Sequence, residues 1–537
     1  MTAMPEKSEK YFFLLTLALL CAFIIMYGYY LIHNACLVYG DESLLFTEFL
    51  KRKKIPTLCC GARRFSPLVL QEYRLFVSSN LNCDVKVILM KIVLFIKMFL
   101  SVVFIVLGMR KVSINKAMIA LTCFLALTAV PGLRNYWSML VVAETTVTTL
   151  WASWFVCFVS ARYSNKGYYY ILAVIFATIA FYVKETAFIL FLPSTLLILA
   201  INFKELSQKA KLYHLMILLQ TIVFFLAYYC SIRHQQEPAY GNWLTTNRFE
   251  IISSYLRSFP IAAICGLLLI IKFIRFLIGK KTNISMADIL SLNSFSFVCA
   301  YVILRMSSAY YFLPANVALC VALLIYLHEF GKSKLVKKLL ALVNIKAIFA
   351  CILLGMLQLM RTSVSEMLLI QKNYLNTKIL LKELSELKKA GHVLATYMPR
   401  PECSDEKSFG FYYWGAAQTI ARLVAFHLND FSYEATFIGK KKFEPVLWCQ
   451  WADHMPYLVV HNTVEYFAKN QTNNKFLIFD DPLMLTNAFQ ADNVIYLYME
   501  LGSSVPNLKL DNEPFKELPF DIKLYRYEPR KSTKNER

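Results

Sequence analysis

The chain has 537 residues, of which 58% are hydrophobic and only 17% are charged. This composition, with a mean hydropathy of +0.48, excludes an ordinary soluble domain. The formal net charge of +22 would favour nucleic-acid binding in a soluble protein. In a membrane protein the same charge is explained by basic cytoplasmic loops and anionic lipid head groups, so we expect a membrane protein with no nucleic-acid partner.

Apolar runs long enough to cross a bilayer recur from Tyr11 to about Arg361. The first run is too long for the core of a signal peptide, and no small-residue cleavage pattern follows it, so we expect it to remain as a transmembrane anchor. We predict about eleven crossings, near 11–32, 87–108, 117–133, 137–160, 168–183, 186–202, 213–232, 259–278, 286–305, 309–329 and 346–361. The predicted fold class is a polytopic α-helical membrane protein with a C-terminal soluble α/β domain.

Short loops rich in Lys and Arg predict the orientation, because such loops stay in the cytoplasm. Most of them fall on one face if Met1 is cytoplasmic, and the exception is "KRKK" at 51–54. An odd number of crossings then places the C-terminal domain on the outer face, which is periplasmic or lumenal. A bacterial inner membrane is favoured over the endoplasmic reticulum.

The chain divides into a predicted transmembrane catalytic domain at 1–361, with a first outer loop at 33–86, and a soluble α/β domain at 362–537. "LLKELSELKKAG" at 380–391 predicts an amphipathic helix closed by Gly391. Helical patterns then alternate with short β-type runs, which is typical of an α/β domain. These runs are "HVLATYM", "ATFIG", "PYLVVHN", "NKFLIFD", "NVIYLYM" and "IKLYRYE", and the clearest helix is "WGAAQTIARLVAFHL".

Charged and aromatic residues gather at five places on the predicted outer face. A carboxylate at the edge of a membrane is costly and is therefore a functional candidate. Two acids with fixed cations suit a reaction on a lipid phosphate, because cations hold the phosphate and an acid accepts a proton from an incoming hydroxyl. The residues are Asp41 and Glu42 after the first crossing, Arg134 and Asn135 before the fourth, Glu144 two turns into it, Lys184 and Glu185 before the sixth, and Arg305, Tyr310 and Tyr311 before the tenth.

Structural roles compete with each of these assignments. The pair Asp41 and Glu42 also fits a solvated loop after a helix. Lys184 fits a side chain that extends its ammonium to the membrane interface, and the arginines fit interfacial anchors. The adjacent tyrosines fit an aromatic belt. Glu144 is the hardest to explain structurally, because its own segment, "VVAETTVTT", offers only hydroxyl partners.

Four segments carry a resemblance to the GT-C superfamily of glycosyltransferases. "GDESLLFTEFLKRKKIPTL" resembles the first loop of that family, where an acid pair follows the first helix. Glu144, in "VPGLRNYWSMLVVAETTVTTLWASWFVCFVSARY", stands where the family has its second acid. "ILAVIFATIAFYVKETAFILFLPSTLLILA" resembles the helices joined at a lysine, here Lys184, and "YYFLPANVALCVALLIYL" resembles a later segment. The branch with protein O-mannosyltransferases and the lipid A aminoarabinose transferase is the most similar.

The resemblance implies transfer of a sugar from a polyprenyl-phosphate carrier to a lipid, glycan or protein on the outer face, with inversion. It implies that Asp41, with Glu42 beside it, is the general base or orients the acceptor. It implies that Glu144 helps to bind the acceptor or a divalent cation, which Asp41 would share, and that Lys184 holds the carrier phosphate. No cofactor is certain. The remaining residues with an implied substrate-binding role are Arg134, Arg305, Tyr310 and Tyr311.

This sequence departs from the family in its late segment. The family has an Arg-Tyr pair where this chain has Tyr310 and Tyr311, and the nearest arginine, Arg305, comes five residues before Tyr310. Two other classes of function remain open. A transporter or flippase of lipid carriers would also explain many crossings with an intramembrane acid. A non-catalytic scaffold would place all binding in the outer domain.

Overall fold

The computed structural model describes residues 6–33, 35–37, 41–55, 65–130, 139–232, 247–278, 284–306, 309–331, 345–397, 423–428 and six further strands. Within these ranges some side chains are not described, among them those of residues 41–44. The chain forms two compact units. The helical unit comprises Met1–Leu31, Pro56–Tyr73 and Lys91–Leu368, and the sheet unit comprises Ile32–Ile55, Arg74–Met90 and Leu369–Arg537.

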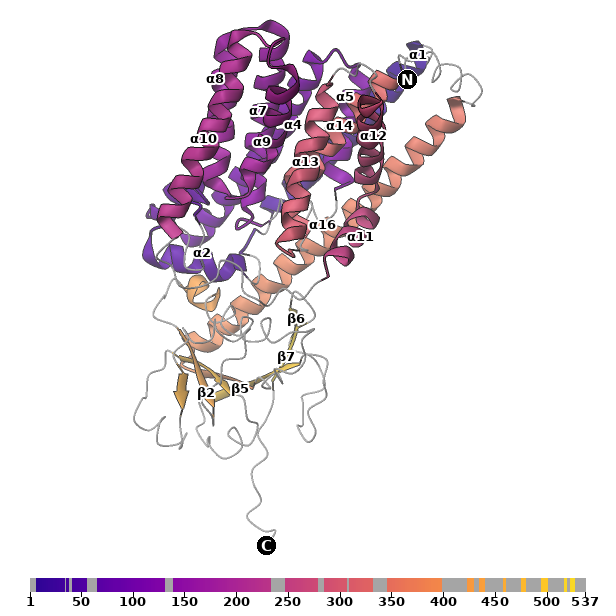
Figure 1. The fold of residues 1–537 in the computed structure, drawn as a ribbon. Helices are drawn as coiled ribbons and strands as arrows, with labels where there is room; N and C mark the ends of the chain where they lie inside the picture. Colours follow the sequence, from indigo (N-terminus) through magenta and orange to yellow (C-terminus); the bar gives the residue numbers. More distant parts are fainter. Residues whose placement is uncertain are drawn as a thin grey trace, which may run out of the picture. The chain divides into compact units, whose positions relative to one another are not determined.

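The helical unit is a bundle of long helices (Figure 1). Its helices are α1 (Glu6–Ile32), α4 (Cys83–Lys111), α5 (Lys116–Thr128), α7 (Ala143–Ser164), α8 (Gly167–Val183), α9 (Leu192–Asn202), α10 (Gln208–Ile232), α11 (Arg248–Ser258), α12 (Pro260–Leu277), α13 (Met286–Ile303), α14 (Leu313–Gly331) and the first part of α16 (Ile345–Lys389). Three 3-10 turns, η1 (Gln71–Tyr73), η2 (Ala187–Leu190) and η3 (Ala309–Phe312), lie in its connections.

The helix α14 lies in the core of the helical unit. It contacts α5, α7, α12 and α13, and it is apolar on all sides, as expected of a helix surrounded by others. The helix α7 contributes the two largest buried side chains, Trp151 and Trp154. Trp154 Nε1 donates a hydrogen bond to Tyr213 Oη at 2.8 Å, which satisfies a polar group that would otherwise be costly inside the core.

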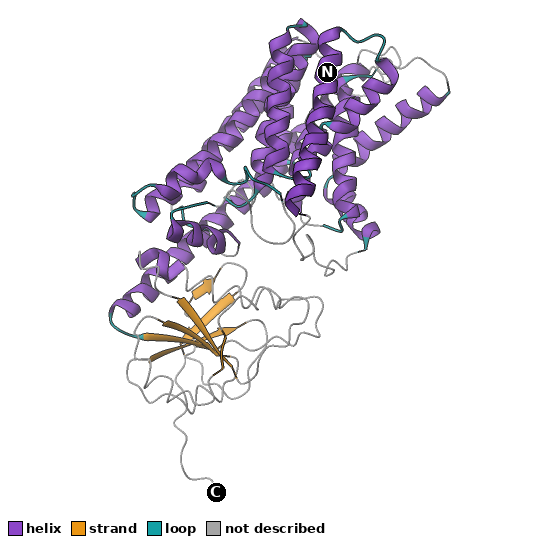
Figure 2. Cartoon of the chain, turned by 60° about the vertical axis from the view of Figure 1, so that its left-hand side comes forward, coloured by secondary structure: helices purple, strands orange, loops and turns teal. Residues whose placement is uncertain are grey.

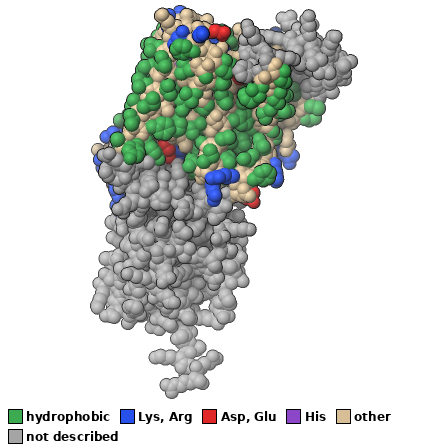
Figure 3. Space-filling view, in the orientation of Figure 1, with side chains coloured by type: hydrophobic (Ala, Val, Ile, Leu, Met, Phe, Trp, Pro, Cys, Tyr) green, Lys and Arg blue, Asp and Glu red, His purple; other side chains and the backbone are tan. Residues whose placement is uncertain are grey.

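Large apolar side chains cover the outside of the helical unit. Leu226 is 60% exposed and Phe273 is 59% exposed, and hydrophobic side chains dominate the visible face between ends that carry Lys and Arg (Figure 3). A soluble protein rarely exposes so large an apolar surface, whereas a bilayer requires it. The chain is therefore a multi-pass membrane protein.

About eleven apolar runs were predicted as crossings, and most of their residues are helical where the structure describes them. Five helices of the described part are long and apolar enough to cross a membrane, or six if α11 and α12 form one bent span. The difference is one of length. The apolar helices α5, α8 and α9 have 13, 17 and 11 residues, whereas a straight crossing needs about 20.

One predicted crossing is broken, and another begins at a sharp bend, for identifiable reasons. The run 186–202 divides into η2 and α9, because Pro193 cannot donate a hydrogen bond within a continuous helix and instead occupies the first turn of α9. The run 259–278 is preceded by α11, which meets α12 at an angle of 103°. Pro260 begins α12 at that bend.

The last crossing and the predicted amphipathic helix at 380–391 are one helix, α16, of 45 residues. No Gly or Pro at 362–379 interrupts the helical pattern between the two. The predicted end is confirmed. Gly391 has φ +86°, and its N–H donates to the Lys388 carbonyl at 3.0 Å, which is the left-handed termination that favours glycine.

The sheet unit contains a seven-stranded sheet (Figure 2). The strands are β1 (Val393–Tyr397), β2 (Glu434–Gly439), β3 (Tyr457–Val459), β4 (Lys475–Phe479), β5 (Val494–Glu500), β6 (Lys516–Leu518) and β7 (Ile522–Arg526), in the order β3-β2-β4-β1-β5-β7-β6. The first five strands are parallel, and β7 and β6 are antiparallel to their neighbours. All six predicted strands are confirmed, and β6 was missed. Of the predicted helix at 414–428, residues 423–428 are described and are helical.

Two helices from the first outer loop also belong to the sheet unit: α2 (Asp41–Arg52) and α3 (Arg74–Ser78). They contact one another. Lys53 Nζ, just after α2, donates to Asn80 Oδ1 at 3.2 Å just after α3. The predicted first outer loop thus contains regular structure.

Candidate functional site

The centre of the candidate site is a buried ion pair between Glu144 and Lys184. Lys184 Nζ lies 3.1 Å from Glu144 Oε1, and the side chains are 8% and 2% exposed. Glu144 stands in the first turn of α7, not two turns inside it as predicted, because the preceding residues form a turn instead of helix. An acid in the first turn is favoured by the partial positive charge of the helix N-terminus.

Lys184 reaches Glu144 because α8 ends immediately before it. Lys184 has an extended backbone conformation, with φ −147° and ψ 124°, so its side chain does not follow the direction of the α8 side chains. Its ammonium also lies 5.3 Å from the centre of the Tyr311 ring, within the range of a cation–π interaction. The structure therefore brings together three predicted site residues from three separate segments, which are the start of α7, the end of α8 and η3.

An aromatic layer supports Tyr311. Its ring stacks on Tyr301 with centroids 5.0 Å apart, and the hydroxyl of Tyr301 is hydrogen-bonded to Thr186 Oγ1 at 2.7 Å. Tyr310 lies with its ring centroid 4.1 Å from that of Tyr311. Tyr310 and Tyr311 thus belong to an aromatic stack that is hydrogen-bonded, through Tyr301, to the residue two positions after Lys184.

The segment before η1 is joined to the residues on either side of Lys184. Ser66 Oγ donates to Glu185 Oε2 at 2.7 Å, and the Leu68 N–H donates to the Tyr182 carbonyl at 3.0 Å. Glu185, which the sequence places beside Lys184, is therefore oriented toward the first outer loop. Ser66 was not among the predicted residues.

A second ion pair, between α4 and η1, contacts the first turn of α7 through Thr146 and was missed. Lys97 Nζ on α4 lies 2.9 Å from Glu72 Oε1 in η1. It also donates to Tyr73 Oη at 2.9 Å and to Thr146 Oγ1 at 3.1 Å, and Thr146 donates to Glu72 Oε1 at 2.7 Å. A lysine in the apolar run "VLFIKMFLSVV" was the available signal, because intramembrane charges are rare and paired.

The Glu72 carboxyl is ionised by this arrangement. Burial raises the pKa of Glu72. The charge of Lys97 and the hydrogen bonds from Thr146, Lys97 and the Glu72 amide together lower it by more, so the pKa lies below its ordinary value.

The remaining predicted residues are placed in part or not at all. Asp41 and Glu42 begin α2 in the sheet unit, but their side chains lie outside the described residues. Arg134 lies outside the described ranges altogether, as does its neighbour Asn135. Their roles stay predictions.

Arg305 follows the end of α13 in a left-handed conformation with φ 57°. Its N–H donates to the Val302 carbonyl at 3.1 Å, and the Met306 N–H donates to the Tyr301 carbonyl at 2.9 Å. These two hydrogen bonds form a Schellman cap at the end of α13, in which the residue after the cap adopts the left-handed conformation. Arg305 is exposed and lies in the turn after α13.

In the described part of the chain, no group of three or more His, Cys, Asp or Glu side chains lies close enough together to hold a metal ion. Glu144 is already paired with the ammonium of Lys184, which would compete with a divalent cation for that carboxylate. The Asp41 side chain lies outside the described residues, so the sharing of a divalent cation between Asp41 and Glu144 stays a prediction.

A third charged cluster links three helices. Lys272 Nζ on α12 lies 2.9 Å from Asp288 Oδ2 on α13 and 3.4 Å from Glu329 Oε2 on α14. Tyr326 Oη donates to Asp288 Oδ1 at 2.8 Å, and Asp288 also closes a capping box with Ser285. Both carboxylate oxygens of Asp288 are thus used, which favours a structural tie between these helices.

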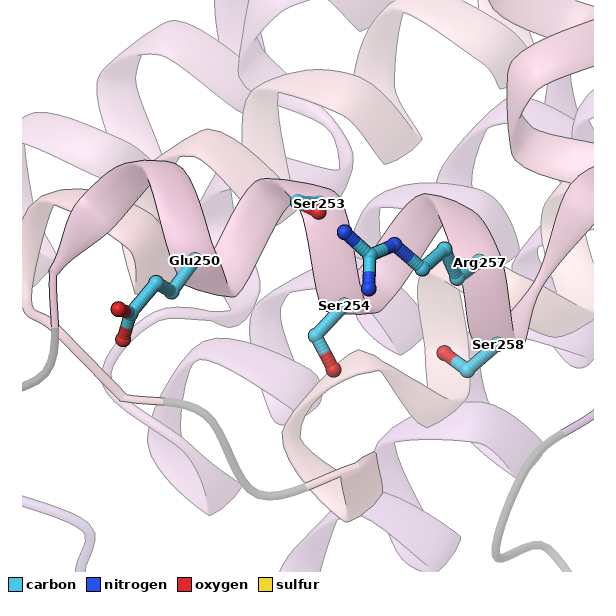
Figure 4. A pocket seen from close by; sticks show the side chains of 5 residues that line it. All are labelled: Glu250, Ser253, Ser254, Arg257 and Ser258. Carbon is cyan, nitrogen blue, oxygen red and sulfur yellow. The ribbon is translucent and has the colours of Figure 1, made fainter.

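The helix α11 has a polar face over a hollow of about 520 Å³ (Figure 4). The residues that line the hollow are Glu250, Ser253, Ser254, Arg257 and Ser258, and they recur at the three- and four-residue spacing of one helix face. Ile251 and Tyr255 are the buried residues of α11, and Tyr255 Oη donates to Asn316 Oδ1 on α14 at 2.8 Å.

No family model matches the sequence, and no curated protein matches it. Among solved structures, the chain is similar to ArnT from Cupriavidus metallidurans bound to undecaprenyl phosphate, with a TM-score of 0.46, 12% identity, and coverage of 95% of this chain and 97% of that one. It is also similar to ArnT from the same organism in the apo state, with a TM-score of 0.45, 12% identity and the same coverage.

Proposed function

We propose that the chain is a membrane glycosyltransferase that moves a sugar from a polyprenyl-phosphate carrier to an acceptor on the outer face. The observation that carries this proposal is the buried pair of Glu144 and Lys184 beside Tyr311. A buried ion pair is often no more stabilising than apolar side chains of the same volume. Its place in a membrane protein, together with the sequence resemblance to GT-C enzymes, therefore favours a functional role.

Lys184 binds the phosphate of the carrier in this proposal. An ammonium has three donors, so Lys184 can hold Glu144 and a phosphate oxygen together. Glu144 fixes the position of the ammonium, and the Tyr311 ring covers one side of it. A cation held in place before the reaction stabilises the charge that develops on the leaving phosphate without reorganisation.

Asp41 is the proposed general base, with Glu42 beside it. The carboxylate of Asp41 accepts the proton of the acceptor hydroxyl, and the acceptor oxygen forms a bond to the anomeric carbon. The bond from that carbon to the phosphate oxygen breaks, and its electron pair leaves with the phosphate. Attack opposite the leaving group inverts the anomeric centre. Arg134, Arg305 and Tyr310 assist substrate binding in this proposal.

The partners and the membrane orientation are part of the same proposal. The carrier is a polyprenyl-phosphate sugar in the membrane, and the acceptor is a lipid, glycan or protein. The N-terminus is cytoplasmic, as the basic loops favour, and the sheet-containing domain faces outward and shapes the acceptor site. A bacterial inner membrane is the proposed location.

Transfer of radiolabelled sugar from synthetic polyprenyl-phosphate donors to membrane lipid and glycan tests this function. We expect purified wild type to transfer label, Asp41→Asn to lose transfer while it retains carrier binding, and Lys184→Met to lose both. Lys166→Met is the matched control, because Lys166 is exposed before α8. Consumption of no donor by folded wild type would refute a transferase. Wild-type turnover in Asp41→Asn would move the base elsewhere.

A lipid-carrier transporter is the second candidate, and the bend of 103° between α11 and α12 favours it. Transporters build their sites from interrupted helices, and α11 presents polar groups at its hollow. A cysteine introduced at position 144 separates the two functions. Labelling from both faces of the membrane supports transport, and labelling from one face supports transfer.

A further inference from the structure

The two side chains that donate to the Glu72 carboxylate in the described part of the chain both bind the same oxygen. Oε1 accepts from Lys97 Nζ at 2.9 Å and from Thr146 Oγ1 at 2.7 Å. Among the described residues no other side chain donates to Oε2, and the side chain is 21% exposed. An ionised carboxylate fixed at one oxygen and open at the other is suited to accept a hydrogen bond from a ligand.

The segment that carries Glu72 is rigidly supported. Its start is tied to the residues around Lys184 through Ser66 and Leu68. Leu70, two residues before Glu72, has φ 59° and is 3% exposed. A leucine persists in this left-handed conformation only where the surrounding structure enforces it, and such strain clusters at functional sites.

Glu72 lies beside the turn that carries Glu144. Its partner Thr146 follows Glu144 by two positions in the first turn of α7. Two residues correspond to about 200° around a helix and about 3 Å along it. The Glu72 and Glu144 ion pairs therefore flank the N-terminal end of α7 from opposite sides.

The charge of Glu72 selects the class of ligand. A carboxylate oxygen repels phosphate and accepts hydrogen bonds from neutral hydroxyl groups. We propose that Glu72 binds a hydroxyl group of the transferred sugar through Oε2, while Lys97 and Thr146 hold the carboxylate in place. This inference rests on the proposed glycosyltransferase function and assigns it a specificity-determining residue.

Donors that each lack one sugar hydroxyl test the inference. With wild type, loss of the bound hydroxyl lowers kcat/KM about 10- to 100-fold, as expected for a hydrogen bond to a charged group. In Glu72→Gln, kcat/KM for that donor should differ far less from kcat/KM for the complete donor. For the other deoxy donors, the ratio of kcat/KM to that of the complete donor should be the same as in wild type. Thr146→Val removes one hydrogen bond to Glu72 but leaves its carboxylate in place. This variant should still distinguish the complete donor from the deoxy donor, with a lower thermal stability.

A purely structural Glu72 would give a different pattern. Glu72→Gln would then lower kcat/KM by one common factor for every donor, and that result overturns the inference while leaving the proposed function intact. If wild type turned over no donor, the proposed function itself would fail. Thermal stabilisation by methyl glycosides would then decide the inference, because equal stabilisation of wild type and Glu72→Gln refutes it and stabilisation of wild type alone supports it.

Discussion

Glu144 and Lys184 form a buried ion pair, with 3.1 Å between Oε1 and Nζ, that joins the start of α7 to the end of α8. The pair brings two opposite charges together in a buried place, where each charge would be costly alone. Each therefore depends on the other for the compensation of its charge, and this dependence determines how the protein responds to substitution.

Removal of one partner should be more harmful than removal of both. Lys184→Met or Glu144→Gln leaves an uncompensated polar or charged group, and loss of one member of a buried pair costs about 3–5 kcal/mol. The double variant should melt at a higher temperature than either single variant in the same detergent. A double variant that melts at the temperature expected from the sum of two independent losses would contradict this coupling.

The ring of Tyr311 should matter for donor binding more than its hydroxyl. Tyr311→Leu removes a cation–π interaction worth about 0.5–2 kcal/mol, so KM for the donor should rise about 2- to 30-fold. Tyr311→Phe keeps the ring and should remain close to wild type. Steady-state kinetics of both variants checks the prediction, and equal impairment would assign the effect to the hydroxyl.

Acid should remove the contribution of Glu72 to stability. The pKa of Glu72 is lowered in the folded protein, so its stabilising effect is complete above the unfolded value, about 4.3, and is lost as the pH falls through the lower folded pKa. Wild type should therefore lose more thermal stability than Glu72→Gln between about pH 6 and pH 3.5. Parallel melting curves for the two proteins across this range would refute the prediction.

The end of α16 should require glycine. Gly391 has φ +86° and open space around its Cα, so Gly391→Ala meets no clash and loses only backbone free energy, about 1–2 kcal/mol. Amide hydrogen exchange should accelerate in the last turn of α16. Gly355→Ala is the matched control, because Gly355 is inside the same helix with no atom within 4 Å, and this change should slow exchange.

Local chemistry explains what was predictable from the sequence. The length of apolar runs determines that the chain belongs in a membrane, since a bilayer core demands about 20 apolar residues from a straight helix. Short β-type runs located six of the seven described strands, and Gly391 marked the end of a helix. The three-residue strand β6 was missed because "KEL" lacks apolar alternation.

Tertiary structure decided which charges meet. The sequence singled out Glu144 and Lys184 separately, but only the packing of α7 against α8 places their atoms in contact. Glu72 was overlooked because nothing within its own segment distinguishes it from a loop acid, and its partner Lys97 comes from another helix. Periodicity reports how one segment buries its own surface, whereas an ion pair depends on the relative position of segments that are distant in the chain.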